Sequence, residues 1–125
     1  MGIKGKTAVS DAELEILEVL WSAGCALNAN EIRSRLDETK NWERTTVLTL
    51  INRLSKKNVI SQEKRGVYYY APRIRREEYV REETKNFIEK FFQGSSKSLA
   101  AALVDSEALT KEDIEELRDY FNQNI

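Results

Sequence analysis

The chain has 125 residues, of which 41% are apolar, 33% charged and 9% aromatic, a balance typical of a soluble, mainly helical protein of one or two small domains. Twenty basic and 21 acidic side chains give a net charge of -1 and histidine is absent, which excludes serine-histidine catalysis, histidine-ligated zinc and a histidine pH switch. The single cysteine, Cys25, excludes an intramolecular disulfide, and no run approaches the roughly 18 apolar residues of a membrane span. With no signal-peptide core behind the first residues, we expect a cytoplasmic protein without metal or cofactor, and Cys25 as a small, half-buried residue.

Two short helices are predicted in the first forty residues. Ser10-Asp11-Ala12-Glu13 has the spacing of a capping box, which opens a helix over residues 11–22, and Gly24 ends it. Asn28 followed by Glu31 repeats this logic and opens a second helix that runs to about residue 37.

The third predicted helix covers residues 44–57 and has one clear hydrophobic face. Its apolar side chains recur at the spacing of three, four and seven residues that one side of an α-helix requires. The residues that should face the core are Val47, Leu50, Ile51 and Leu54.

The hydrophobic period changes after residue 58, which predicts a β-hairpin. Residues 59–64 and 67–71 are β-prone runs joined by Arg65-Gly66. Residues 73–93 then form a long helical stretch, and two shorter helices are predicted at 97–104 and after the cap Thr110. Three helices followed by a hairpin make a winged helix-turn-helix. The expected fold is therefore mainly α, with a winged-helix domain at residues 1–72 and a helical dimerisation domain at residues 73–125.

The near-zero net charge hides an uneven distribution. Residues 40–76 carry ten basic and two acidic side chains, a local charge of +8, so the remainder of the chain carries -9. The basic segment coincides with the third helix and the hairpin, and phosphate is its natural counter-charge. An ordinary solvated surface is the alternative interpretation of the same residues.

If the hydrophobic face of residues 44–57 is buried, the polar face points outward with groove-compatible side chains. Threonine and asparagine can contact base edges, while arginine and lysine neutralise phosphates. Leu48 also falls toward the exposed side, where it contacts either a thymine methyl or the hairpin. The predicted DNA-binding residues are Arg44, Thr45, Thr46, Thr49, Asn52, Arg53 and Lys56 on the helix and Lys64 and Arg65 at the hairpin tip.

The C-terminal half has more large apolar residues than about fifty residues can bury within one chain, so we predict a homodimer. An intrachain core is the alternative. The predicted dimerisation residues are Tyr79, Val80, Phe87, Ile88, Phe91, Leu103, Leu117 and Phe121.

The ordered combination of these residues resembles a known family. The residues that carry the resemblance are Trp42, Thr45-Thr46-Val47, Thr49, Arg53-Leu54, Lys56-Lys57, Val59-Ile60 and the run from Arg65 to Pro72. They are similar to the penicillinase repressors, methicillin-resistance regulators and copper-responsive repressors, and the similarity extends from Ser10 to Leu117. The resemblance implies a homodimeric winged-helix repressor that reads an inverted repeat and controls antibiotic resistance in some members.

The resemblance also implies a route by which repression is relieved. In the penicillinase group a membrane-bound sensor protease leads to cleavage in a C-terminal helix, which corresponds here to Ala102-Leu103. Related sequences have asparagine where this chain has Ala102. The copper-responsive members carry paired Cys-x-Cys motifs, and this chain has no cysteine after Cys25, which disfavours copper sensing.

Three functions remain to be distinguished. The first is a transcriptional repressor that occupies an operator and is not an enzyme. The second is a winged-helix protein-interaction module without sequence-specific DNA binding. An enzyme is the third, but the carboxylate pairs Glu77-Glu78, Glu82-Glu83 and Glu115-Glu116 diverge on solvated helix faces and are poorly placed for acid-base catalysis.

Overall fold

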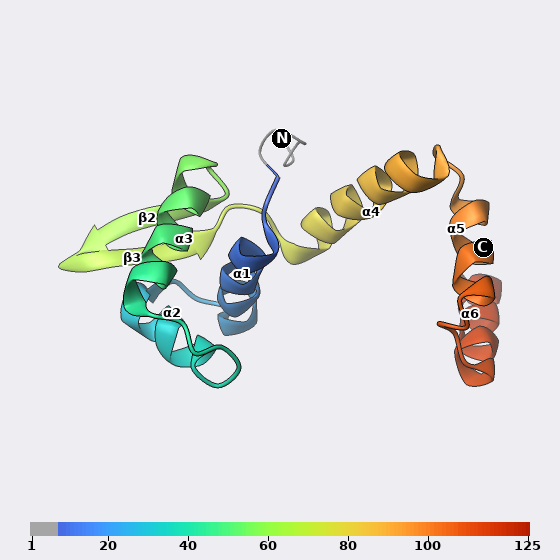
Figure 1. The fold of residues 1–125 in the computed structure, drawn as a ribbon, viewed down its shortest axis with the longest axis horizontal. Coiled ribbons are helices and arrows are strands. Elements are labelled where there is room, and N and C mark those ends of the chain that lie inside the picture. The colour runs from blue at the N-terminus through green and yellow to red at the C-terminus, as the bar shows by residue number, and fades with distance from the viewer. Residues whose placement is uncertain (1–7) are drawn as a thin grey trace. The chain divides into compact units, whose positions relative to one another are not determined.

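The computed structural model describes residues 8–125, which form two compact units that divide between Glu82 and Glu83. The first unit contains the helices α1 (Asp11–Ala23), α2 (Ala29–Leu36) and α3 (Arg44–Lys56), followed by the strands β2 (Ile60–Arg65) and β3 (Val67–Pro72) (Figure 1). This order of three helices and a hairpin confirms the predicted winged helix-turn-helix.

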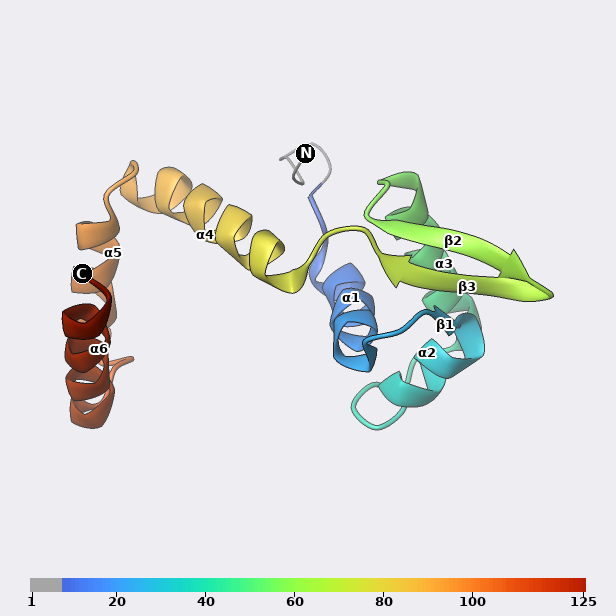
Figure 2. The same ribbon diagram turned by 180° about the vertical axis from the view of Figure 1, so that it is seen from behind.

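A third strand, β1 (Leu27–Asn28), completes the sheet of the first unit. It pairs antiparallel with β3, which gives the strand order β1-β3-β2, and Figure 2 shows it beside β3 in the connection between α1 and α2. Tyr70 is central, because it lies opposite Leu27 on one side and Gln62 on the other. The sequence does not predict β1, since two residues are too few to show an alternating pattern.

One hydrophobic core holds the first unit together. All four residues expected on the inner face of α3 are in it, and both capping boxes form as predicted, Ser10 with Glu13 and Asn28 with Glu31. The buried apolar residues are Ile16, Leu17, Leu20, Leu27, Ile32, Leu36, Val47, Leu50, Ile51, Leu54, Val59, Ile60, Tyr70 and Tyr79.

The chain leaves the sheet through a short bent segment, residues 73–75, before α4 (Arg76–Phe92) begins. The Arg73 N–H donates to the Val59 carbonyl at 2.8 Å, and the Trp21 indole N–H donates to the Ile74 carbonyl at 2.9 Å. These hydrogen bonds keep residues 73–75 out of the helix, which starts three residues later than predicted. Arg76 then forms an ion pair with Glu18 at 2.9 Å, and this hydrogen bond raises the pKa of the guanidinium.

The start of α4 belongs to the core of the first unit. The ring of Tyr79 is buried, with its centroid 5.6 Å from that of Trp21. The expectation that Tyr79 serves dimerisation is therefore wrong, because its own chain covers it.

Cys25 differs from its expectation as well. Gly24 caps the end of α1 in the left-handed conformation, with a φ of 69°, and the chain turns there. Cys25 follows in the turn and is exposed, not half-buried.

The second unit consists of the remainder of α4, α5 (Ser96–Asp105) and α6 (Lys111–Asn124). Ser95 caps α5, and Thr110 forms a capping box with Asp113 at the start of α6. Not one residue between 83 and 125 is buried within the single chain. Large apolar side chains are instead exposed, and Phe87 and Phe91 lie against each other on α4 with ring centroids 5.0 Å apart.

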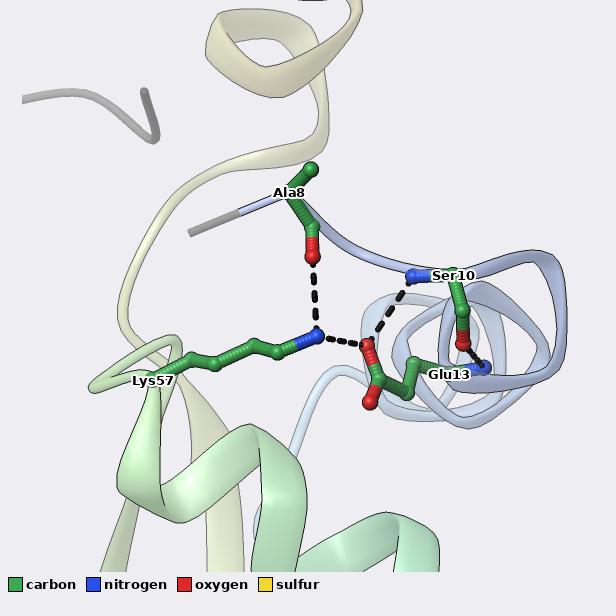
Figure 3. Close-up of polar contacts among 4 residues, drawn as sticks. All are labelled: Ala8, Ser10, Glu13 and Lys57. Carbon is green, nitrogen blue, oxygen red and sulfur yellow. Dashed lines mark hydrogen bonds and ion pairs between the residues drawn. The ribbon is translucent and has the colours of Figure 1, made fainter. Parts of the chain in front are cut away.

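A buried carboxylate connects the end of α3 to the beginning of α1 (Figure 3). Lys57, which follows α3, donates from its ammonium group to Glu13 Oε1 and to the Ala8 carbonyl, the latter at 2.8 Å. The same carboxylate accepts from the Ser10 N–H at 2.9 Å as part of the capping box. Only 2% of the Glu13 side chain is exposed. The ion pair therefore holds the C-terminal end of α3 against the first helix.

The same contacts determine the protonation of Glu13. Burial opposes ionisation and raises the pKa, but the hydrogen bonds from Lys57 and Ser10 and the charge of Lys57 outweigh it, so the pKa of Glu13 lies below its usual value of 4.5.

We expect the replacement Lys57→Met to destabilise the fold. It leaves a buried carboxylate without its cation, which costs about 1–3 kcal/mol of unfolding free energy. Urea denaturation measures the loss. Lys56→Met is the matched control, because Lys56 is an exposed neighbour and its loss should change stability by less than about 0.5 kcal/mol. Equal stabilities for the two variants would contradict the role of the buried pair.

The ion pair also predicts a dependence of stability on acid pH. Because the folded-state pKa of Glu13 lies below its unfolded value of 4.5, the unfolded chain takes up the proton first and protonation favours unfolding. The contribution of Glu13 is present above about pH 4.5 and is lost as the pH falls through the folded pKa. Urea denaturation at stepped pH should show wild type exceeding Glu13→Gln in stability near pH 6, with the gap narrowing toward pH 3. A gap that stays constant would contradict this.

Candidate nucleic-acid interface

The outer face of α3 carries every predicted DNA-binding residue of that helix, and all of them are exposed. With the opposite face buried in the core, the periodicity of the helix fixes these side chains outward. The first unit therefore does not cover its own candidate reading surface. The exposed residues are Arg44, Thr45, Thr46, Thr49, Asn52, Arg53 and Lys56.

One of the threonines uses its hydroxyl within the helix. Thr49 Oγ1 donates to the Thr45 carbonyl at 2.9 Å, a bond that threonine commonly forms one turn back along a helix. Thr49 is exposed, and its hydroxyl oxygen can still accept a hydrogen bond while its proton is used within the helix.

The hairpin presents both predicted cations at its tip, where Gly66 makes the turn with a φ of 83°. Lys64 lies 5.9 Å from the ring centroid of Tyr68. Arg65 lies 5.2 Å from that of Tyr69 and forms an ion pair with Glu63 at 2.6 Å. Cation-π contacts of this kind orient the charged groups, and Glu63 neutralises one of the two charges.

Ion pairs reduce the positive charge that the sequence places in residues 40–76. Five of its ten basic side chains contact a carboxylate, and these are Lys40, Lys57, Arg65, Arg75 and Arg76. Among the residues that the structure describes, Arg44, Arg53 and Lys56 of α3 form no ion pair. The unpaired positive charge is thus concentrated on the helix that carries the polar face.

A surface hollow of about 390 Å³ lies between the start of α2, the first half of α3 and the hairpin. Leu48 is half-buried there and shares the hollow with Val67 and Tyr68, so it contributes to the junction of α3 with the hairpin. Burial and the neighbouring Tyr68 raise the pKa of Tyr70, which also lines the hollow and stays neutral at physiological pH. The lining residues are Asn28, Ala29, Asn30, Arg44, Leu48, Val67, Tyr68 and Tyr70.

The predicted dimerisation residues, apart from Tyr79, retain substantial exposure. Ile88 is half-buried, and the exposed members are Val80, Phe87, Phe91, Leu103, Leu117 and Phe121. Ala102 and Leu103, which the family resemblance aligns with a cleavage site of related repressors, lie inside helix α5.

Within residues 8–125, no helix has both the length and the apolar character needed to cross a lipid bilayer. The same part of the chain contains no group of three or more acidic or cysteine side chains arranged to hold a metal ion.

Comparison with known proteins gives matches along most of the chain. The chain is 33% identical over 110 residues to the penicillinase repressor of Bacillus licheniformis. This match covers 87% of this chain and 85% of that protein. It is also 34% identical over 116 residues to the methicillin resistance regulatory protein MecI of Staphylococcus aureus strain N315. This match covers 92% of this chain and 94% of that protein.

Two solved structures are similar to part of the chain. The solution structure of the DNA-binding domain of the repressor BlaI has a TM-score of 0.53 and 36% identity over 61% of this chain and 93% of its own. The solution structure of the monomeric form of Bacillus licheniformis BlaI in complex with the blaP half-operator has a TM-score of 0.50 and 37% identity. This match covers 58% of this chain and 88% of that chain. The family model for the penicillinase repressor matches residues 9–123. The chain belongs to the penicillinase repressor family.

Proposed function

We propose that the protein is a cytoplasmic transcriptional repressor that binds double-stranded operator DNA as a homodimer. The observation that carries this proposal is the outer face of α3, where threonine, asparagine and unpaired basic side chains stand opposite a fully buried apolar face. The similar BlaI structure, solved with a half-operator, supports the same use of this fold.

The proposed docking places α3 in the major groove and the hairpin along the neighbouring backbone. Thr45, Thr46 and Asn52 meet base edges, while Arg44, Arg53 and Lys56 neutralise phosphates. Lys64 and Arg65 approach the backbone or the minor groove from the hairpin tip, where the tyrosine rings orient them.

The proposed homodimer follows from the second unit. Side chains as large as Phe91 and Phe121 are about half exposed there, and residues 83–125 have no buried core of their own. Apolar faces of this extent are typical of an interface. A two-fold dimer doubles the DNA contact and matches an inverted repeat.

Repression in this proposal is by occupancy, since the bound dimer excludes the polymerase. Any signal that separates the second units weakens operator binding, because each half-site then binds alone. A membrane-bound sensor protease is one candidate partner. Because Ala102 and Leu103 lie within α5, cleavage there requires local unwinding of that helix.

We expect a gel shift to distinguish a repressor from a protein-interaction module. The full chain should bind a palindromic duplex, selected from a random library, at least about a thousandfold more tightly than random duplex at physiological salt. Affinity should fall steeply as salt is raised, because phosphate contacts release counterions. Weak binding that is equal for both duplexes would favour the interaction module.

Replacements on α3 should separate phosphate contacts from base contacts. Arg53→Ala should weaken binding to all duplexes and lower the slope of log affinity against log salt by about 1, whereas Thr46→Ala should change sequence preference by about 1–3 kcal/mol at one position. Arg35→Ala is the control, because Arg35 is an exposed arginine at the end of α2 and not on α3. Arg53→Ala and Thr46→Ala variants that bind like wild type would count against α3 as the reading helix.

The dimer is testable by light scattering. Wild type at tens of micromolar should have the mass of a dimer, and Phe121→Glu should have the mass of a monomer, since the added charge lies on an apolar face. Gln123→Glu adds the same charge at an exposed polar position of α6 and should remain dimeric. A monomeric wild type would refute the proposal.

A further inference from the structure

The hollow between α2, α3 and the hairpin places an apolar surface next to the polar reading face. Leu48 lies one helical turn after Arg44 and one turn before Asn52, so it is a surface neighbour of both. Val67 and Tyr68 of β3 also line the hollow and are 57% and 45% exposed. The hollow is therefore continuous with the surface that meets DNA in the proposed function.

The chemistry of the hollow restricts what it can recognise. The side chains of Leu48 and Val67 offer no donor or acceptor to a base edge or a phosphate. The major groove presents one distinctive apolar group, the C5-methyl of thymine. Leu48 is a large half-buried apolar side chain on α3. It is therefore better suited to contact a methyl group than the polar residues around it.

The charges around the hollow complement DNA in the same orientation. Arg44 lines the hollow beside Leu48, and the Lys64 ammonium lies over the ring of Tyr68, which also lines the hollow. Both cations are placed to meet the phosphates that flank a base seated between them. None of the residues that line the hollow is acidic, so the lining carries no negative charge that would repel a phosphate.

We propose that Leu48, together with Val67 and Tyr68, seats the C5-methyl group of one thymine in each operator half-site and makes the protein select thymine there. The inference rests on the proposed DNA binding and adds a specificity-determining residue to it. The other apolar occupant that DNA offers, a deoxyribose of the backbone, is common to all sequences and gives no preference for thymine.

The experiment begins with the duplex that the full chain selects from a random library. Each thymine of that duplex is replaced in turn by deoxyuridine, which removes only the methyl group. At one position per half-site the affinity of wild type should fall about fourfold, the ratio that corresponds to about 0.8 kcal/mol for one buried methyl. In Leu48→Ala the same replacement should leave the affinity unchanged.

Matched variants separate this effect from a general loss of structure. Leu14→Ala truncates another half-buried leucine, on α1, and should keep the full deoxyuridine effect. Leu48→Met preserves the volume of the side chain and should keep most of it. The deoxyuridine scan of wild type needs no variant, so it tests the inference even where Leu48→Ala fails to fold.

The outcomes are distinct for the inference and for the proposed function. Failure to enrich any duplex would overturn the proposed function and the inference with it. A selected duplex that is insensitive to deoxyuridine at every position would overturn the inference alone. A deoxyuridine effect of equal size in wild type and in a folded Leu48→Ala would do the same, since another residue would then contact the methyl.

Discussion

The arrangement of the first unit depends on burying one side of α3. Val47, Leu50, Ile51 and Leu54 fill the core, and because each residue of an α-helix advances by a fixed rotation, their burial determines where every other side chain of α3 points. The periodicity of the helix does not fix the position of its end. The Glu13–Lys57 ion pair does so, because it holds the end of α3 against α1. A helix held at its face and at its end can present Thr45, Thr46 and Asn52 in a constant orientation, which recognition of base edges requires.

Local patterns in the sequence were sufficient to predict most of the fold. The capping boxes, the inward face of α3 and the hairpin around Gly66 each depend on residues close together in the chain. The family resemblance supported the same winged-helix arrangement. The exposure of the candidate DNA-binding residues of α3 could also be predicted from local sequence, because these residues lie on the side of the helix opposite its buried apolar face.

The features that the sequence did not predict depend on residues far apart in the chain. Lys57 is one of the ten basic residues between positions 40 and 76, and nothing in the sequence shows that it pairs with Glu13 across 44 positions. The hydrophobic pattern places Tyr79 among the dimerisation residues, yet its ring is buried and lies against Trp21. The later start of α4 reflects a hydrogen bond from Arg73 to the Val59 carbonyl, and a strand as short as β1 is defined only by its pairing with β3. No periodicity in the sequence encodes these contacts.

The absence of buried side chains between residues 83 and 125 has a consequence for how such a repressor behaves in a cell. If this half gains its core only from a second copy, its folding and its assembly are one equilibrium, and the folded fraction obeys mass action. The number of copies per cell then sets how much competent protein exists. A modest fall in abundance, by turnover or by dilution at cell division, would release the controlled genes more sharply than a monomeric regulator would.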